Sequence, residues 1–458
     1  MKYNKNYKGE FFIAGEDKNI VFGVLKFLNG TAYIDLFGHF YSRKNHKSTV
    51  EIIYGHLDNG ESCIFCNCTL KPPHPFHRTN FVNFDYFIYA PTHIITRDSG
   101  KKIEFNAINF RLDYLTSWTG LDFFESFYEG DKIAGVKRIV QNLDDLILYN
   151  DDNYELRITH AHTVPIINPY SNYTLEQESW LYCDLKGTLN FHEIFDFLLE
   201  IEQLFILMMG TNTVITTPIT LYSTEEKSHY CYRNTRNVRF EPLNNSESNP
   251  LTHEFFIDLN SLKDQTELKS FFESWKKVRL KYEYSVLKIV ESLSNTSKNH
   301  ESTFLNLVFA LEKLIEKDMP SKNDVKELSN KDERHIAILE RENIPKNTIN
   351  YLKAKIKKVN RRTLKDKVSD YLKEYEKHSL ELWKLDYDLF INKLVDSRNH
   401  LAHLCNKCEY RMELKEYPNF NRGLLKILLV ILFNKLGIGS EYTMKVVNRN
   451  QLLELKEK

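Results

Sequence analysis

The first 185 or so residues form short segments rich in Phe, Tyr, Ile and Val, in which apolar and polar positions alternate. In one of them Ala32, Ile34 and Leu36 alternate with Tyr33 and Asp35. Turn sequences such as Asn-Gly at 29–30 and Asp-Asn-Gly at 58–60 separate the segments. A period of two with short turns is typical of antiparallel hairpins. The pattern predicts a β-rich, sandwich-like N-terminal domain.

The spacing of apolar residues changes to a helical period at residue 189. An amphipathic helix is expected from 189 to 209, followed by a strand-like stretch, TVITTPITLY, and a loop or hinge at 242–250. Beyond about residue 260 helices are expected at 264–293, 301–318, 346–359, 363–376, 384–403 and 420–436. The fold class is therefore α+β and multidomain. We expect a β-rich domain at 1–188, a mixed, mainly helical linking region at 189–295 and an all-α domain at 296–458.

Length and composition change this picture little. With 458 residues, 42% of them hydrophobic, the chain is long enough for two or three cores. Lys plus Arg and Asp plus Glu number 62 each, so the overall charge does not indicate a polyanionic partner. The N-terminus lacks the apolar stretch of a secretory signal, which predicts a cytoplasmic protein. The longest apolar run, 424–433, is about half of the ~20 residues that span a bilayer and predicts a buried helix.

The sequence DSRNHLAH at 396–403 ends one of the expected helices and gathers groups suited to phosphodiester chemistry. Arginine can hold a phosphate with two hydrogen bonds, and histidine exchanges a proton near neutral pH. Asn399 and His403 are four residues apart and share a helix face. Arg398 and His403 are separated by about 140° on an ideal helix, so we expect either a distorted helix or a second protomer to complete the site. A plain solvated helix end, where the dipole favours Arg and His, is the alternative.

The motif resembles the R-N-x-x-x-H signature of the HEPN superfamily, here Arg398, Asn399 and His403 in an all-helical domain. The resemblance implies a helical bundle at 296–458 that works as a homodimer or higher oligomer and cuts RNA without a metal, leaving a 2′,3′-cyclic phosphate. Arg398 and His403 would be catalytic and Asn399 supporting. The segment 304–317 is similar to the family's first core helix, which often carries an acidic residue facing the site. Glu312 is the candidate for that role.

The N-terminal half resembles the ApeA-like proteins of bacterial antiphage abortive infection. The matching sequences are YKGEFF at 7–12, GVL at 23–25, IDLFG at 34–38, IIYG at 52–55 and TL at 69–70. This resemblance implies that the N-terminal domain responds to a phage-derived trigger. The HEPN domain would then cut cellular RNA, with tRNA as the expected substrate.

A basic run from Lys353 to Lys367 begins within the expected helix at 346–359 and is a candidate track for an RNA backbone. Its proposed RNA-binding members are Lys353, Lys357, Lys358, Arg361 and Arg362. Runs of this kind are more often solvated helix faces, and both interpretations stay open.

Two C-x-x-C pairs, Cys63 with Cys66 and Cys405 with Cys408, could supply four thiolates to a structural zinc ion. No cofactor is expected for catalysis. Separate thiols are the alternative, because regular strand alternation would place Cys66 and Cys68 on one face and Cys63 on the other.

Two further functions compete with the nuclease. One is a non-catalytic HEPN module that binds nucleotide, RNA or a protein partner through the same arginine and histidine. The other is the toxin of a toxin–antitoxin pair, in which a separate protein restrains the nuclease. No membrane partner is expected.

Overall fold

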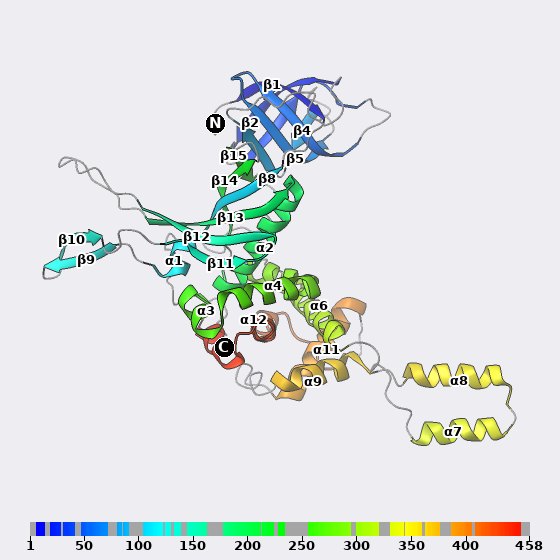
Figure 1. Cartoon of the computed structure of the whole chain (residues 1–458). Helices are drawn as coiled ribbons and strands as arrows, with labels where there is room; N and C mark the ends of the chain where they lie inside the picture. The colour runs from blue at the N-terminus through cyan, green and yellow to red at the C-terminus, as the bar shows by residue number, and fades with distance from the viewer. Residues whose placement is uncertain are drawn as a thin grey trace. The chain divides into compact units, whose positions relative to one another are not determined.

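The computed structural model divides the chain into two compact units. Unit 1 comprises residues 1–252 and 258–263, and unit 2 comprises 253–257 and 264–458. Strands form most of unit 1, and helices form unit 2 (Figure 1). The structure describes residues 6–13, 19–28, 31–41, 47–71, 80–84, 86–90, 104–121, 124–129, 132–138, 144–162, 177–211, 213–223, 228–233, 255–294, 299–319, 330–342, 344–359, 362–375, 386–404 and 408–449.

Unit 1 begins with a closed antiparallel barrel. Its strands are β1 (Tyr7–Ile13), β2 (Val21–Leu28), β3 (Thr31–Leu36), β4 (Thr49–Leu57), β5 (Ser62–Lys71) and β6 (Asn80–Asn83). Their order is β5-β4-β1-β2-β3-β6, and β6 pairs back onto β5 to close the ring. Because every strand of the ring has a neighbour on both sides, all six are paired along their backbones.

The barrel interior is filled by aromatic and aliphatic side chains from alternate strand positions. Phe11 and Phe65 are fully buried there, with ring centroids 5.9 Å apart. Gly9 and Gly23 face each other across β1 and β2. A Cβ on Gly9 would lie 2.6 Å from the carbonyl oxygen of His56, and one on Gly23 would lie 2.7 Å from that of Asp35. The strands therefore approach too closely at these two positions for any side chain.

The sheet continues beyond the barrel, because β5 also pairs with β7. The strands that follow are β7 (Tyr86–Ala90), β15 (Ser228–Arg233), β14 (Ile215–Ser223), β8 (Phe105–Leu112), β13 (Gln177–Leu189), β12 (Tyr154–His162) and β11 (Leu146–Asn150). A separate hairpin joins β9 (Phe124–Glu129) to β10 (Lys132–Arg138). The expected antiparallel β-rich class is confirmed, and its form is a barrel that opens into a sheet.

Two helices accompany the sheet, α1 (Leu115–Thr119) and α2 (Phe191–Met209), and both contact β13. Helix α2 begins at a capping box, in which the Asn190 side chain accepts from the Glu193 amide and the Glu193 side chain accepts from the Asn190 amide. It ends at Gly210, which has a φ of 66°. The helix expected at 189–209 is therefore confirmed apart from its first two residues, of which Leu189 ends β13 and Asn190 is the N-cap.

Unit 2 is a helical bundle. Its helices are α4 (Leu268–Lys281), α5 (Glu283–Ser294), α6 (His300–Asp318), α7 (Asn330–Arg341), α8 (Lys346–Val359), α9 (Leu364–Leu372) with the 3-10 turn η5 (Lys373–Tyr375), α11 (Tyr387–His403), α12 (Tyr417–Lys435) and α13 (Ser440–Arg449). The division between the units falls within α3 (Leu259–Gln265). Helix α6 packs against α5, α9, α11 and α12. The apolar run 424–433 lies in α12 and is buried, as predicted.

One expected helix is wrong in its length. The segment 264–293 is not continuous, because Tyr282 leaves the helical conformation between α4 and α5, at φ −118° and ψ 28°. The expected linking region 189–295 is shared between the units, since α2, β14 and β15 belong to unit 1 and α4 and α5 to unit 2. The loop expected at 242–250 lies outside the described residues.

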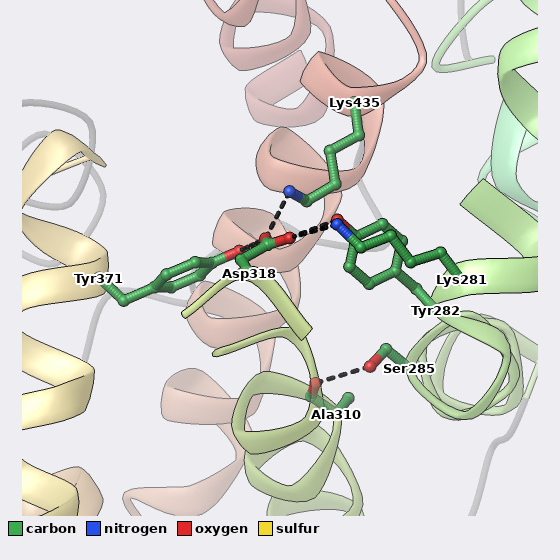
Figure 2. A network of polar contacts seen from close by, with 7 residues as sticks. All are labelled: Lys281, Tyr282, Ser285, Ala310, Asp318, Tyr371 and Lys435. Carbon is green, nitrogen blue, oxygen red and sulfur yellow. Dashed lines mark hydrogen bonds and ion pairs between the residues drawn. The ribbon is translucent and has the colours of Figure 1, made fainter. Parts of the chain in front are cut away.

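The end of α6 is held by a polar network centred on Asp318 (Figure 2). Its carboxylate accepts hydrogen bonds from Lys435 at 2.5 Å, Tyr371 at 2.8 Å, Lys281 at 3.2 Å and also from Tyr282. These partners come from α12, α9, the end of α4 and the residue that separates α4 from α5. One carboxylate thus ties α6 to three neighbouring parts of the bundle.

The network keeps Asp318 ionised. Partial burial acts to raise its pKa, but the hydrogen bonds from Lys435, Tyr282 and Tyr371 outweigh burial and lower the pKa to about 2. Farther along α6, the Ser285 hydroxyl donates to the Ala310 carbonyl at 2.8 Å and joins α5 to α6 (Figure 2). These contacts with α5, α9 and α12 fix the position of α6, which also packs against α11.

Candidate active site

Helix α11 carries the R-N-x-x-x-H motif on its last two turns. Its apolar side faces the bundle through Phe390, Ile391, Leu394 and Val395, all of them buried. The helix ends at His403, because Leu404 adopts the left-handed conformation with φ 51° and ψ 38°. The motif therefore stands at the end of a helix whose other turns are locked in the core.

Arg398 is held by Glu312 from the facing helix α6. Its Nε donates to Glu312 Oε1 at 2.8 Å and its Nη2 donates to Glu312 Oε2 at 3.3 Å. This two-point contact matches the planar guanidinium to the carboxylate. The two side chains are 18% and 24% exposed, so solvent reaches the pair without separating it. The predicted candidate acid does face the motif.

The other terminal nitrogen of Arg398 contacts the two remaining motif residues. Nη1 donates to Asn399 Oδ1 at 3.3 Å and lies 2.9 Å from His403 Nε2. Because a guanidinium has no acceptor, His403 Nε2 is the acceptor in this contact. Four of the five N–H groups of Arg398 are thereby engaged within the protein.

The expectation that one continuous helix cannot bring Arg398 and His403 together is wrong. Helix α11 runs without interruption to His403, and the two side chains still touch. The 140° separation describes where the Cβ atoms point, whereas a long arginine side chain can bend around the last turn. Neither a distorted helix nor a second protomer is needed for this contact.

The segment after α11 is fixed to the helix by two side chains to which the sequence analysis gave no role. Asp396 Oδ2 accepts from the Tyr410 amide at 2.9 Å, and Ser397 Oγ accepts from the Met412 amide at 2.8 Å. Asp and Ser are poor helix formers because they bond to nearby backbone. Their presence inside an apolar helix, directly before the motif, is the sequence signal that could have revealed the anchors.

The predicted RNA track is described only in part. Lys353 Nζ donates to Glu340 at 2.7 Å, and Arg362 forms an ion pair with Asp370. The side chains of Lys357, Lys358 and Arg361 lie outside the described residues. The two described members therefore already carry acidic partners, and the RNA track stays a prediction.

The cysteine pairs are also described in part. Cys63 and Cys68 both belong to the barrel core, so the expectation that Cys66 and Cys68 share a face is wrong. Asn67, with a φ of 54°, interrupts the alternation between them. Burial, followed by the charge of Glu61, raises the pKa of Cys63, which opposes the thiolate that zinc requires.

Cys405 lies outside the described residues, and Cys408 belongs to the helical unit. Within the ranges that the structure describes, no group of three or more His, Cys, Asp or Glu side chains could hold a metal ion. A zinc ion shared by the two pairs stays a prediction. In the same ranges, no helix has the length and apolar character needed to cross a bilayer.

The arrangement gathers groups suited to phosphodiester chemistry. It places a guanidinium, an imidazole and an amide at one helix end, with a carboxylate holding the guanidinium. A helical bundle with this R-N-x-x-x-H cluster is the architecture of a HEPN domain, and the family model for the Apea-like HEPN domain matches residues 305–442.

A second family model, the ApeA N-terminal domain 1, matches residues 6–275, more than half of the 458-residue chain. The chain therefore belongs to the ApeA family, whose members are HEPN-type nucleases of abortive infection. Neither a curated protein nor a solved structure matches it.

Proposed function

We propose that this protein is an endoribonuclease of antiphage defence that cuts cellular RNA, with tRNA as the expected substrate. The observation that carries the proposal is the contact between Arg398 and His403 at 2.9 Å, at the end of a helix that faces Glu312. It brings a phosphate-binding group and a proton-transfer group to one point, as RNA cleavage requires.

The proposed reaction needs no metal. His403 takes the proton from a ribose 2′-hydroxyl, and the 2′-oxygen attacks the adjacent phosphorus. The bond from phosphorus to the 5′-oxygen breaks, and His403, acting now as an acid, gives its proton to that leaving oxygen. The products are a 2′,3′-cyclic phosphate and a 5′-hydroxyl end. Arg398 stabilises the negative charge that develops on the phosphate, and Asn399 orients the two side chains.

The described geometry is a resting one for this reaction. Nη1 of Arg398 occupies the Nε2 lone pair that His403 would use as a base. A substrate phosphate would attract the guanidinium and free that lone pair. Binding of RNA would thereby activate the base, and the same contact would keep the histidine inactive before RNA arrives.

The cellular setting of the proposal follows the family. The enzyme would act in the cytoplasm as a homodimer or higher oligomer, and a phage-derived trigger would act through unit 1. The basic segment at 353–362 would guide the RNA backbone. A structural zinc ion on the cysteine pairs would affect folding and take no part in catalysis.

Replacing His403 with Ala tests the proposal. Wild type, His403→Ala and His335→Ala are expressed in bacteria with and without phage, and RNA ends carrying a 5′-hydroxyl are mapped. His335 is an exposed histidine of α7 and serves as the matched control. We expect new ends from wild type and His335→Ala and a loss of at least about 100-fold in His403→Ala.

Two results would contradict the proposal. One is unchanged RNA in every strain while wild type still protects or poisons the cell, which would favour a binding module. The other is purified enzyme whose cleavage stops on chelation while its thermal unfolding stays the same, since metal-independent chemistry would then be wrong. Cleavage that appears only when a neighbouring gene is absent would identify a toxin of a toxin–antitoxin pair.

A further inference from the structure

Helix α11 ends at His403, and described residues from 410 to 412 contact the helix again. Leu404 takes the left-handed conformation, which a residue with a Cβ disfavours, and its side chain is 79% exposed. Contacts elsewhere must therefore hold the segment that follows, because the turn itself is not a favoured one.

Two motif-proximal side chains supply those contacts. Asp396 binds the Tyr410 amide and Ser397 binds the Met412 amide, at 2.9 and 2.8 Å. Met412 is 5% exposed, so its side chain enters the bundle. Arg411 lies between these two fixed residues and is exposed to solvent.

The anchored segment lies along the face of α11 that carries the histidine. Asp396 and His403 are seven residues apart, which is close to two helical turns, so they share a face about 10 Å apart along the axis. The Tyr410 amide is bonded to the first of these residues. The backbone at Arg411 is therefore held next to the turn of α11 that directly precedes the motif, between the two anchored amides.

The charge of Arg411 is available to such a phosphate. Within the described part of the chain, no carboxylate forms an ion pair with Arg411, whereas Arg398 is held by Glu312 and Lys415 pairs with Glu413 at 2.9 Å. The guanidinium of the motif itself, that of Arg398, therefore has an acidic partner. The one on the anchored segment is exposed to solvent.

We infer that Arg411 binds a backbone phosphate flanking the scissile one, and that Asp396 and Ser397 are positioning residues that hold it there. The inference rests on the proposed ribonuclease function. It adds a substrate subsite on the segment Tyr410–Met412 that the R-N-x-x-x-H motif does not contain.

Equilibrium binding of a labelled oligouridine to the full chain tests this inference. His403→Ala is the background, so that the probe is not cut. Adding Arg411→Ala should weaken binding about three- to tenfold at low salt and lower the slope of log K against log salt by about 0.7, the value for one contact to a single strand. Arg411→Lys should retain most of the binding affinity and most of the salt slope.

Lys415→Ala is the matched control. It removes the same charge four residues farther along the chain, at a residue already paired with Glu413. It should leave the slope unchanged. Equal effects of Arg411→Ala and Lys415→Ala would overturn the inference, since the effect would then be one of general charge. An unchanged slope in Arg411→Ala would overturn it as well.

The positioning role has its own readout. Ser397→Ala removes no charge, yet it should lower the salt slope as Arg411→Ala does, and the double variant should show no further decrease. If the decreases in slope caused by Ser397→Ala and Arg411→Ala add in the double variant, the positioning role of Ser397 is wrong. In the cleavage assay Arg411→Ala should raise KM and leave kcat within about twofold, which loss of the Arg398 and His403 chemistry would not do.

A failure of the ribonuclease proposal can be distinguished from a failure of this one. If wild type does not cleave, the slope measurement still reports whether Arg411 touches RNA. If His403→Ala abolishes cleavage while Arg411→Ala binds as its background does, the nuclease stands and the flanking subsite is wrong.

Discussion

At the scale of single residues, Arg398 already has protein partners that the proposed substrate would have to displace. It holds Glu312 through two hydrogen bonds and His403 through a third, so a phosphate must compete with groups that are already in place. The pair is partly exposed, which reduces the free energy of the contact through solvent screening. In the proposed enzyme the Glu312 carboxylate would lower the affinity for RNA while it keeps the guanidinium in position.

Replacing Glu312 with Gln should reveal this competition. We expect Glu312→Gln to tighten oligouridine binding about three- to tenfold in the His403→Ala background, because a negative charge next to the phosphate is removed. Glu316→Gln, an exposed acid on the same helix paired with Lys313, is the control and should bind as before. Weaker binding in Glu312→Gln would show that Glu312 mainly positions Arg398.

The sequence predicted which residues meet in the site better than how they meet. Glu312, Arg398, Asn399 and His403 follow from the motif and its resemblance, and the structure brings all four together. The angle on an ideal helix predicts that Arg398 and His403 meet only through a distorted helix or a second protomer, because it describes Cβ directions and not the reach of an arginine. The anchors Asp396 and Ser397 were missed, since their partners are backbone amides of a returning segment.

At the scale of elements, the position of α6 depends on one carboxylate. Asp318 receives four donors, two of them from lysines. Its pKa of about 2 lies below the ordinary value of 3.8, so the ionised form is the one stabilised by folding. This contribution is complete above about pH 4 and is lost as the pH falls through about 2.

Asp318→Asn should destabilise unit 2. We expect a loss of about 3 kcal/mol at neutral pH, because two lysines lose their counter-charge in a partly buried site. About 2 kcal/mol of the wild-type stability should disappear between pH 4 and 2, and the variant should not show this part. Urea unfolding followed against pH measures both effects. Equal acid sensitivity of the two proteins would rule out Asp318 as the group responsible.

Most helices of unit 2 were predictable, whereas α7 and α13 were not among the expected helices and helix continuity was not predicted. The helix expected at 346–359 has those bounds, because its apolar period is local to it. The helix expected at 264–293 divides at Tyr282, whose hydroxyl bonds to Asp318 from a different helix. That partner is distant in sequence, so a local pattern does not contain the break.

At the scale of the whole molecule, two units have separate cores. The barrel core consists of unit 1 residues, and the Asp318 network consists of unit 2 residues. The strands were predictable from alternation, whereas closure of the barrel was not. Closure depends on β6 pairing with both β3 and β5, and pairings of this kind are not encoded in any single segment.

Calorimetry should resolve two transitions. We expect Gly23→Ala to lower the free energy of unfolding of unit 1 by about 2 kcal/mol, because the new Cβ would meet the backbone of Asp35. Asp318→Asn should lower the unfolding temperature of the other transition, that of unit 2. Gly187→Ala, where nothing lies within 4 Å of the new Cβ, should change neither. A single transition that both variants shift together would mean that the units unfold as one.

The return of β6 onto β5 leaves the large sheet with one open edge. Of the strands in its described order, only β11 lacks a partner on one side. An unpaired row of amides and carbonyls is a template for a strand from another chain. Here β11 is short and its register is irregular between Ile147 and Tyr149. Both features discourage edge-to-edge association. Among the thirteen described strands of the sheet, the one unpaired edge is therefore poorly suited to pairing with another chain.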